Sequence, residues 1–304
     1  MQKLKRWVII IAIISPLAVF SQMDEIKMDF DTARAGGYSI HDYHFNAGNE
    51  WQVLKFIKQY ENDPHEGVRS YVRVLRAKLA RQTADTVLRQ QIIESFVEDC
   101  LLPYGDISQY VCERLQYCQQ QDFSPRAKQL MLAVFDKGQY ERKFLLVCGV
   151  AQLKQLIPKL KKIAHGFDRT NDDWQGTIAW YASLALLRMG ASANVEAMIT
   201  AVELEANEVY RIGTLLRFIA YTRHPDCIKL MRKYLESSAR LPAIRKSLVP
   251  PVKEEFGMPH NRYALHYLAR YMDNFPVKYD DAISYSTEEL ETAREYFKKK
   301  EGRR

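Results

Sequence analysis

Three tyrosines are spaced so that they can form one aromatic stripe. Tyr263, Tyr267 and Tyr271 follow one another at intervals of four residues, so on a helix they share one face. A tyrosine joins a flat apolar ring to a polar tip, which suits stacking on a sugar or anchoring a peptide. Leu265 and Leu268 define an adjacent apolar face, which favours ordinary packing. We therefore favour half-buried core residues as the interpretation of the stripe, and we keep its three tyrosines as candidate binding residues.

Two further sets of side chains suit recognition of a partner. Trp174 follows Asp172 and Asp173 at a predicted helix start, where we expect it to be accessible. Arg211 and Arg217 lie on a predicted helix and can line a cationic groove for an acidic partner. Acidic residues are interspersed with these arginines, so a mixed solvated surface is the favoured interpretation. The predicted binding residues are Trp174, Tyr263, Tyr267, Tyr271, Arg211 and Arg217.

Signatures of catalysis are absent from the sequence. It contains no Gly-x-Ser-x-Gly elbow, no glycine-rich phosphate loop and no His-Glu-x-x-His motif. His41, Asp42 and His44 form the densest cluster of potential metal ligands. Their segment has no helical register to hold them in place, so we expect a solvated loop. We accordingly predict no catalytic residue, no metal and no cofactor.

The first residues are typical of a secretory signal peptide. Lys3, Lys5 and Arg6 precede the apolar run Val8–Phe20, and Ser21 suits cleavage before Gln22. The apolar run is shorter than a membrane-spanning helix requires, which disfavours the alternative of an uncleaved anchor. We find no second apolar segment long enough to span a bilayer. The sequence therefore predicts export to the periplasm or outside the cell, with no integral membrane segment after cleavage.

The net charge of +7 does not indicate a nucleic-acid partner. The predicted signal carries three cations and no anions, and residues 298–304 carry five cations and one anion. Residues 22–297 are therefore formally neutral, whereas a nucleic-acid surface requires a basic stripe in the folded part. The cysteines, five in number, leave at least one thiol unpaired within the chain. Their pairing stays open, with small core residues as the favoured interpretation.

Apolar residues recur at helical spacing through nearly all of the mature chain. Val68, Val72, Leu75 and Leu79 are one such series. Proline or glycine punctuates the series at positions where helices begin or end. The predicted helices cover 49–61, 64–82, 85–101, 106–120, 125–137, 139–148, 150–164, 172–189, 192–205, 207–222, 225–238, 261–273 and 287–300.

The predicted helices form pairs that repeat about every thirty-five residues, the range of helical solenoid repeats. Residues 155–163 resemble the second helix of a HEAT repeat, and residues 178–190 are similar to a HEAT first helix that ends in glycine. The resemblance is best over 139–238. It implies an all-α, right-handed solenoid of stacked antiparallel helix pairs. It also implies a protein or peptide partner on a concave row of second helices, and it assigns no particular site residue.

These observations predict four regions. They are a signal peptide at 1–21, an extended or partly disordered segment at 22–48, a HEAT-like helical repeat domain at 49–300, and a basic tail at 301–304. The leading hypothesis is a non-enzymatic exported scaffold that binds a protein or peptide. The alternatives are a cell-envelope enzyme on a helical scaffold, with polysaccharide as its candidate substrate, and a purely structural assembly component.

Overall fold

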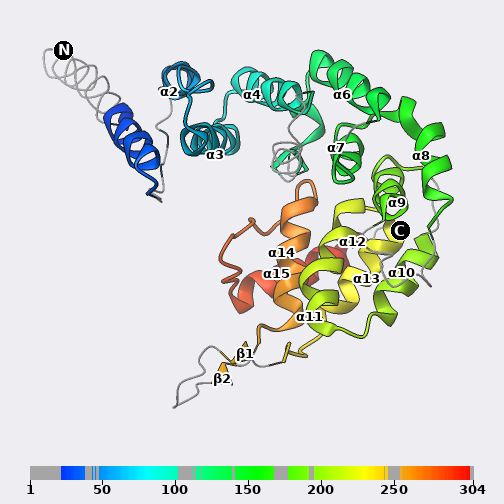
Figure 1. The fold of residues 1–304 in the computed structure, drawn as a ribbon. Helices are drawn as coiled ribbons and strands as arrows, with labels where there is room; N and C mark the ends of the chain where they lie inside the picture. Colours follow the sequence, from blue (N-terminus) through cyan, green and yellow to red (C-terminus); the bar gives the residue numbers. More distant parts are fainter. Residues whose placement is uncertain are drawn as a thin grey trace, which may run out of the picture. The chain divides into compact units, whose positions relative to one another are not determined.

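Helices make up the fold. The computed structural model describes residues 22–37, 43, 45, 48–101, 112, 114–116, 118–138, 141–167, 177–191, 195–242, 244–245, 254–255 and 257–301. Over these residues the regular secondary structure is helical, apart from one pair of short strands (Figure 1). This confirms the predicted all-α class. Within the same residues, every helix is too short or too polar to cross a membrane. The predicted signal peptide, 1–21, lies outside the described residues.

The chain divides into two compact units, Met1–Leu102 with Gln121–Ala133 and Pro103–Gln120 with Val134–Arg304. The first unit contains a helix at residues 22–34. The other helices that begin in the first unit or at its border are α2 (Glu50–Lys58), α3 (Glu66–Gln82), α4 (Thr86–Asp99), the 3-10 turn η1 (Gln120–Asp122) and α6 (Pro125–Lys137). Asp85 begins α4 by accepting hydrogen bonds from Val87 and Leu88 backbone N–H groups, as an N-cap residue does.

Residues 22–34 form a helix, which differs from the extended or partly disordered segment expected over 22–48. Ile26 and Phe30 are fully buried. Asp29, only 2% exposed, accepts hydrogen bonds from the hydroxyls of Tyr71 (2.6 Å) and Tyr43. Paired donors are what a buried carboxylate requires. The buried face of this helix therefore combines apolar anchors with a satisfied carboxylate.

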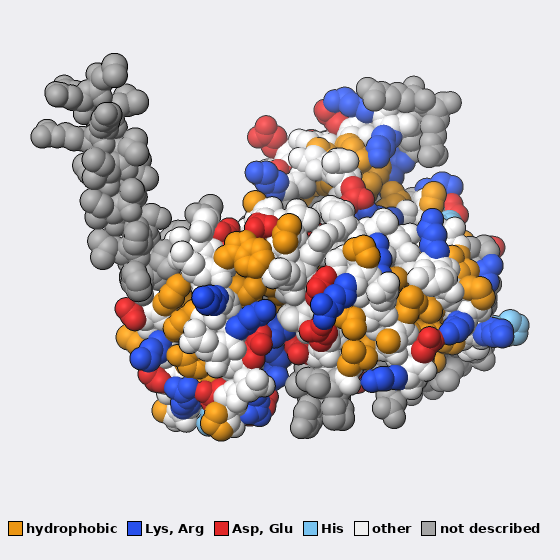
Figure 2. Space-filling view, turned by 90° about the horizontal axis from the view of Figure 1, so that it is seen from above, with side chains coloured by type: hydrophobic (Ala, Val, Ile, Leu, Met, Phe, Trp, Pro, Cys, Tyr) orange, Lys and Arg blue, Asp and Glu red, His pale blue; other side chains and the backbone are white. Residues whose placement is uncertain are grey.

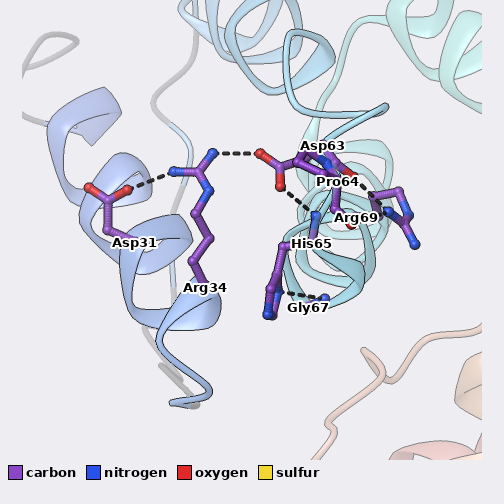
Figure 3. A network of polar contacts seen from close by, with 7 residues as sticks. All are labelled: Asp31, Arg34, Asp63, Pro64, His65, Gly67 and Arg69. Atoms are coloured by element: carbon purple, nitrogen blue, oxygen red, sulfur yellow. Dashed lines mark hydrogen bonds and ion pairs between the residues drawn. The ribbon is translucent and has the colours of Figure 1, made fainter.

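The C-terminal end of the same helix is held by charge (Figure 3). Arg34 bridges Asp31 at 2.7 Å and Asp63 at 2.5 Å. Asp63 also accepts a hydrogen bond from the His65 backbone N–H, and the Nδ1 of His65 accepts one from Gly67 at the start of α3. A Cβ on Gly67 would lie 3.2 Å from the Ala33 carbonyl oxygen. A glycine there thus permits the close approach of the helix to α3.

The second unit is a series of short helices. They are α7 (Phe144–Val150), the 3-10 turn η2 (Lys154–Leu156), α8 (Ile157–Ala164), α9 (Ile178–Arg188), α10 (Val195–Leu204), α11 (Glu208–Tyr210), the π-helical segment η4 (Arg211–Leu215), α12 (Leu216–Thr222), α13 (Pro225–Leu235), α14 (His260–Tyr271) and α15 (Thr287–Glu301). Side chains of Thr177, Asn207 and His224 cap three of these helices at their N-termini. Helices α10 to α15 agree with those predicted to within a few residues. Helix α7 begins at Phe144 instead of 139, and α8 begins at Ile157 instead of 150. The predicted helix 106–120 and the start of the predicted helix 172–189 lie mostly outside the described residues.

Successive helices of this unit pack in chain order (Figure 1). Helix α7 packs on α9, α9 on α12 and α12 on α14, while α10 packs on α13 and α13 on α15. Polar side chains join the C-terminal ends. Gln152 Nε2 donates to the Arg188 carbonyl oxygen at 2.8 Å, and Arg188 Nη1 donates to that of Tyr221 at 2.8 Å. In each link, a side chain from an earlier part of the chain caps the C-terminal end of a later helix, whose last carbonyl groups require such partners.

The closest approach between these helices occurs at Gly149 in α7. Tyr221 in α12 donates its hydroxyl to the Leu146 carbonyl oxygen at 2.6 Å and is 1% exposed. A Cβ on Gly149 would overlap that hydroxyl and would lie 3.1 Å from the Cα of Ala185 in α9. Three helices therefore converge on one glycine. This explains the glycine at a buried position near the end of α7, although alanine has the higher helix propensity.

The proline-rich segment 241–261, between α13 and α14, contains the strand pair. Strands β1 (Ile244–Arg245) and β2 (Glu254–Glu255) are antiparallel, with Ile244 opposite Glu255. Arg240 forms an isolated bridge with Pro259. The His260 backbone N–H donates to the Ala239 carbonyl oxygen at 2.8 Å. These bonds bring the end of the connection back beside its start, and α14 begins there.

Candidate binding surface

The tyrosine stripe on α14 serves mainly to pack that helix. Tyr267 and Tyr271 are 5% and 4% exposed, and Tyr263 is half-buried against the ring of Tyr267. The Tyr271 ring meets the ring of Tyr221 edge-on at 6.0 Å. The predicted accessible row is therefore reduced to Tyr263, because Tyr271 packs against α12 and Tyr267 contacts the π-helical segment η4. Tyr267 and Tyr271 are therefore core residues, as in the packing interpretation of the stripe.

The π-helical segment lies opposite this stripe. Tyr267 donates its hydroxyl to the Gly213 carbonyl oxygen at 2.6 Å. A π turn inserts one extra residue into an α-helix and is frequent at functional sites. It also shifts the register of the side chains that follow. Arg211 opens this segment and Arg217 follows it in α12, so the segment sets where both predicted arginines lie.

Arg211 belongs to a compact cluster of charged groups. Glu208 Oε1 lies 3.5 Å from Arg211 Nη2 and 3.4 Å from His260 Nε2. His260 is 4% exposed, and its ring lies 6.1 Å from that of Tyr234. Burial lowers the pKa of the His260 imidazole, while the Glu208 carboxylate opposes this shift. His260 is therefore neutral near pH 7, and the cluster joins the start of α11 to the start of α14.

Two exposed aliphatic side chains flank the connection between α10 and α11. Leu204 is 71% exposed and Val209 is 47% exposed. Arg211 Nη1 donates to the Glu205 carbonyl oxygen at 2.8 Å, and Asn207 accepts a hydrogen bond from the Tyr210 backbone N–H. These bonds hold the connection in one conformation. We call Leu204, Val209, Tyr210 and Arg211 the corner surface.

Arg217, in α12, adds a cation that lies against aromatic rings in the same region. Its guanidinium carbon lies 4.9 Å from the centroid of the Phe218 ring, and the Tyr181 ring meets that ring edge-on at 5.8 Å. Burial raises the pKa of Tyr210, and the charge of Arg217 opposes the rise, so these two side chains are electrostatic neighbours. Exposed aliphatic, tyrosine and arginine side chains are therefore gathered around α11.

Trp174, His41, Asp42 and His44 lie outside the described residues. Over the part of the chain that the structure describes, His, Cys, Asp and Glu side chains form no group of three or more that is able to hold a metal ion. Figure 2 shows one face of the molecule, on which Lys and Arg alternate with Asp and Glu among apolar side chains.

No protein-family model matches the chain, and neither the curated proteins nor the solved structures provide a significant match. The interpretation of the site therefore depends on its own geometry.

Two parts of this region were not predicted from the sequence. Glu208 and His260 are separated by more than fifty residues, so their spacing carries no local motif. Leu204 and Val209 fall in predicted helices, where an apolar residue ordinarily indicates a buried face. The detectable signal is that Leu204 directly precedes the polar connection and Val209 lies two residues after the N-cap Asn207. Neither side chain therefore has a neighbouring helical turn to cover it.

Proposed function

We propose that the chain is an exported, non-enzymatic scaffold of HEAT-like helix pairs that binds a protein or peptide partner at the corner surface. Serial packing of α7, α9, α12 and α14 supports a solenoid arrangement, because each short helix buries its apolar face against the next. The absence of recognisable catalytic motifs in the sequence supports a binding role.

The observation that carries the proposal is the exposure of Leu204 and Val209 beside tyrosine and arginine. Leaving an aliphatic side chain in water forgoes roughly 1.5–3 kcal/mol relative to burial. Tyrosine and arginine are enriched among residues that dominate binding energies. A hydrogen-bonded connection holds these groups before any partner arrives, which lowers the entropy lost on binding. The corner surface thus has the composition and rigidity of a binding site.

Site-specific photocrosslinking tests this proposal. A photoreactive amino acid replaces Leu204 or Val209 in the intact chain, and Val87 is the matched control because it is also an exposed valine in a first helical turn, 59% exposed. We expect a discrete crosslinked product from positions 204 and 209 only. Leu204→Asp, which leaves the fold unstrained at so exposed a position, is expected to abolish the product at 209. Equal crosslinking from position 87, or no product in native envelope preparations, would contradict the proposal.

Export is a separate part of the proposal and has its own test. The basic and apolar residues before Gln22 support it. Cell fractionation followed by N-terminal sequencing is expected to find the mature chain outside the cytoplasm, beginning at Gln22. Recovery of a cytoplasmic chain that begins at Met1 would refute export and leave the binding proposal intact.

One observation favours the alternative of a cell-envelope enzyme. Burial keeps the His260 imidazole neutral, and Glu208 Oε1 lies 3.4 Å from its Nε2, close to the distance at which a carboxylate orients a general base. If the pair is catalytic, purified protein releases reducing ends from envelope polysaccharide and His260→Gln loses that activity. Because His260 is 4% exposed, a substrate has little access to it, and we favour the scaffold.

A further inference from the structure

Two arginines lie at the C-terminal ends of neighbouring helices in the second unit. Arg188 is the last residue of α9, and its guanidinium carbon lies 5.4 Å from the centroid of the Tyr221 ring. Arg223 follows α12 in the left-handed conformation, with φ of 57°. Its Nη1 forms an ion pair with Asp273 beyond α14. The two cations thus come from helices that pack directly on each other.

Arg188 is half-buried, and its partners differ from those of buried Arg76 and half-buried Arg89. Arg76, 4% exposed, contacts Glu61 at 3.0 Å and Asp99 at 2.9 Å, and Arg89 contacts Asp122 at 3.1 Å. Among the described residues, the one hydrogen bond of Arg188 runs from Nη1 to the Tyr221 carbonyl oxygen. Within the same part of the chain, no carboxylate lies within ion-pair distance of Arg188. A charge removed from water ordinarily requires such a partner.

The local charge is correspondingly unbalanced. Burial lowers the pKa of Arg188 to about 10, with the charge of Arg223 as the next cause, while Asp273 opposes the shift. Two guanidinium groups therefore share one carboxylate. The carbonyl ends of the helices supply only about half a negative charge each. The Nε of Arg223 is also buried with no hydrogen-bond partner among the described residues.

We propose that Arg188 and Arg223 together bind an anionic oxygen group, a carboxylate or a phosphate, at the C-terminal ends of α9 and α12. A guanidinium presents its N–H groups as a planar fork that matches such groups in a bidentate manner. The Tyr221 ring and carbonyl oxygen hold the Arg188 fork in place. Arg223 and Asp273 have side chains 30% and 57% exposed, so their ion pair is weak and open to exchange with a ligand.

This anion site is separate from the corner surface and goes beyond the proposed scaffold function. The anion can be an acidic side chain of a peptide or a free phosphate. Titration calorimetry on the intact chain at low ionic strength distinguishes these sources, with inorganic phosphate and a capped tetraglutamate peptide as the two probes. Binding of either probe that depends on the two arginines supports the site, and the tighter probe identifies its chemistry.

Variants of the three charged residues give the decisive comparison. Arg223→Gln is expected to weaken binding about tenfold or more, the effect of losing one charge-assisted hydrogen bond. Asp273→Asn is expected to strengthen binding about two- to fivefold, because it removes the carboxylate that competes for Arg223. A purely structural ion pair does not produce this gain. Arg188→Gln is expected to abolish binding, with thermal unfolding measured alongside.

Arg126→Gln is the control for net charge, because its side chain is 67% exposed and pairs with Glu98. It removes one cation, as Arg223→Gln does, and is expected to leave binding nearly unchanged. Arg223→Gln and Asp273→Asn carry the test if Arg188→Gln fails to fold. The proposal is overturned if Arg126→Gln weakens binding as much as Arg223→Gln, or if Asp273→Asn leaves the affinity unchanged. Arg188 and Arg223 are then helix caps only.

Discussion

The close approach at Gly149 predicts how two substitutions depend on each other. Gly149→Ala places a methyl group against the Tyr221 hydroxyl and 3.1 Å from the Ala185 Cα. Overpacking of this kind costs roughly 1–3 kcal/mol. Displacing the Tyr221 hydroxyl from the Leu146 carbonyl oxygen adds about 1 kcal/mol. The helix propensity of alanine returns about 0.5–1 kcal/mol. The expected net loss in the free energy of unfolding is about 2 kcal/mol.

Tyr221→Phe removes the atom that the new methyl group would meet. Alone, it is expected to cost about 1 kcal/mol for the buried hydrogen bond. In the Tyr221→Phe background, Gly149→Ala meets only Ala185, so its expected cost falls below about 1 kcal/mol. The two substitutions should therefore be less than additive by at least about 1 kcal/mol, a coupling typical of residues in contact.

Urea denaturation of the wild-type chain, both single variants and the double variant measures this coupling. Gly213→Ala is the matched control, because a Cβ at this other helical glycine meets nothing within 4 Å. Its effect is expected to stay within about 1 kcal/mol of zero. If the losses of Gly149→Ala and Tyr221→Phe simply add, the hydroxyl is not the obstructing atom. The packing argument for α7 against α12 is then wrong.

Three further outcomes follow from buried polar groups. Asp29→Ala leaves two tyrosine hydroxyls without their acceptor and should cost about 2–4 kcal/mol, seen as faster amide exchange over residues 22–34. Burial holds the pKa of His260 and His266 below the usual value, about 6.5 in an unfolded chain. The stability that the two neutral imidazoles contribute is thus complete above that pH and is lost as the pH falls through the folded-state pKa. The melting temperature should therefore drop on acidification. It should drop less in a His260→Gln, His266→Gln double variant. Burial raises the pKa of Cys227 to about 11, so iodoacetamide at mildly alkaline pH should label it only after unfolding, as read by mass spectrometry.

Helix positions were predictable because their signals are local. Pro225 begins α13 behind His224, whose side chain caps the helix, and both residues are adjacent in the sequence. The π-helical segment was not predictable, because Arg211–Leu215 has the same apolar spacing as an ordinary helix. Its carbonyl at Gly213 is satisfied by Tyr267, which lies more than fifty residues later. Only the folded chain brings such partners together.

The helix at 22–34 shows why a composition-based prediction was insufficient. Its buried residues include Ile26 and Phe30 four positions apart, and the third anchor is the carboxylate of Asp29. A hydrophobic pattern counts an aspartate as solvent-exposed, so the stripe is too narrow to detect. The tyrosines that satisfy this carboxylate are remote in the sequence, at 43 and 71.

The surroundings of Arg76 and Arg188 differ in a way that the sequence does not reveal. Arg76 and Arg188 both occupy helices with regular apolar spacing, and the sequence does not distinguish them. Arg76 in α3 forms ion pairs with Glu61, which follows α2, and with Asp99 at the end of α4. Its charge is therefore used in joining these three helices. Arg188 caps a helix with one nitrogen while sharing its surroundings with a second cation. A cap alone needs only a hydrogen-bond donor, which glutamine also supplies, as Gln152 does at the preceding helix end. The use of a full charge where a neutral donor suffices is the reason to look for an anion at this position.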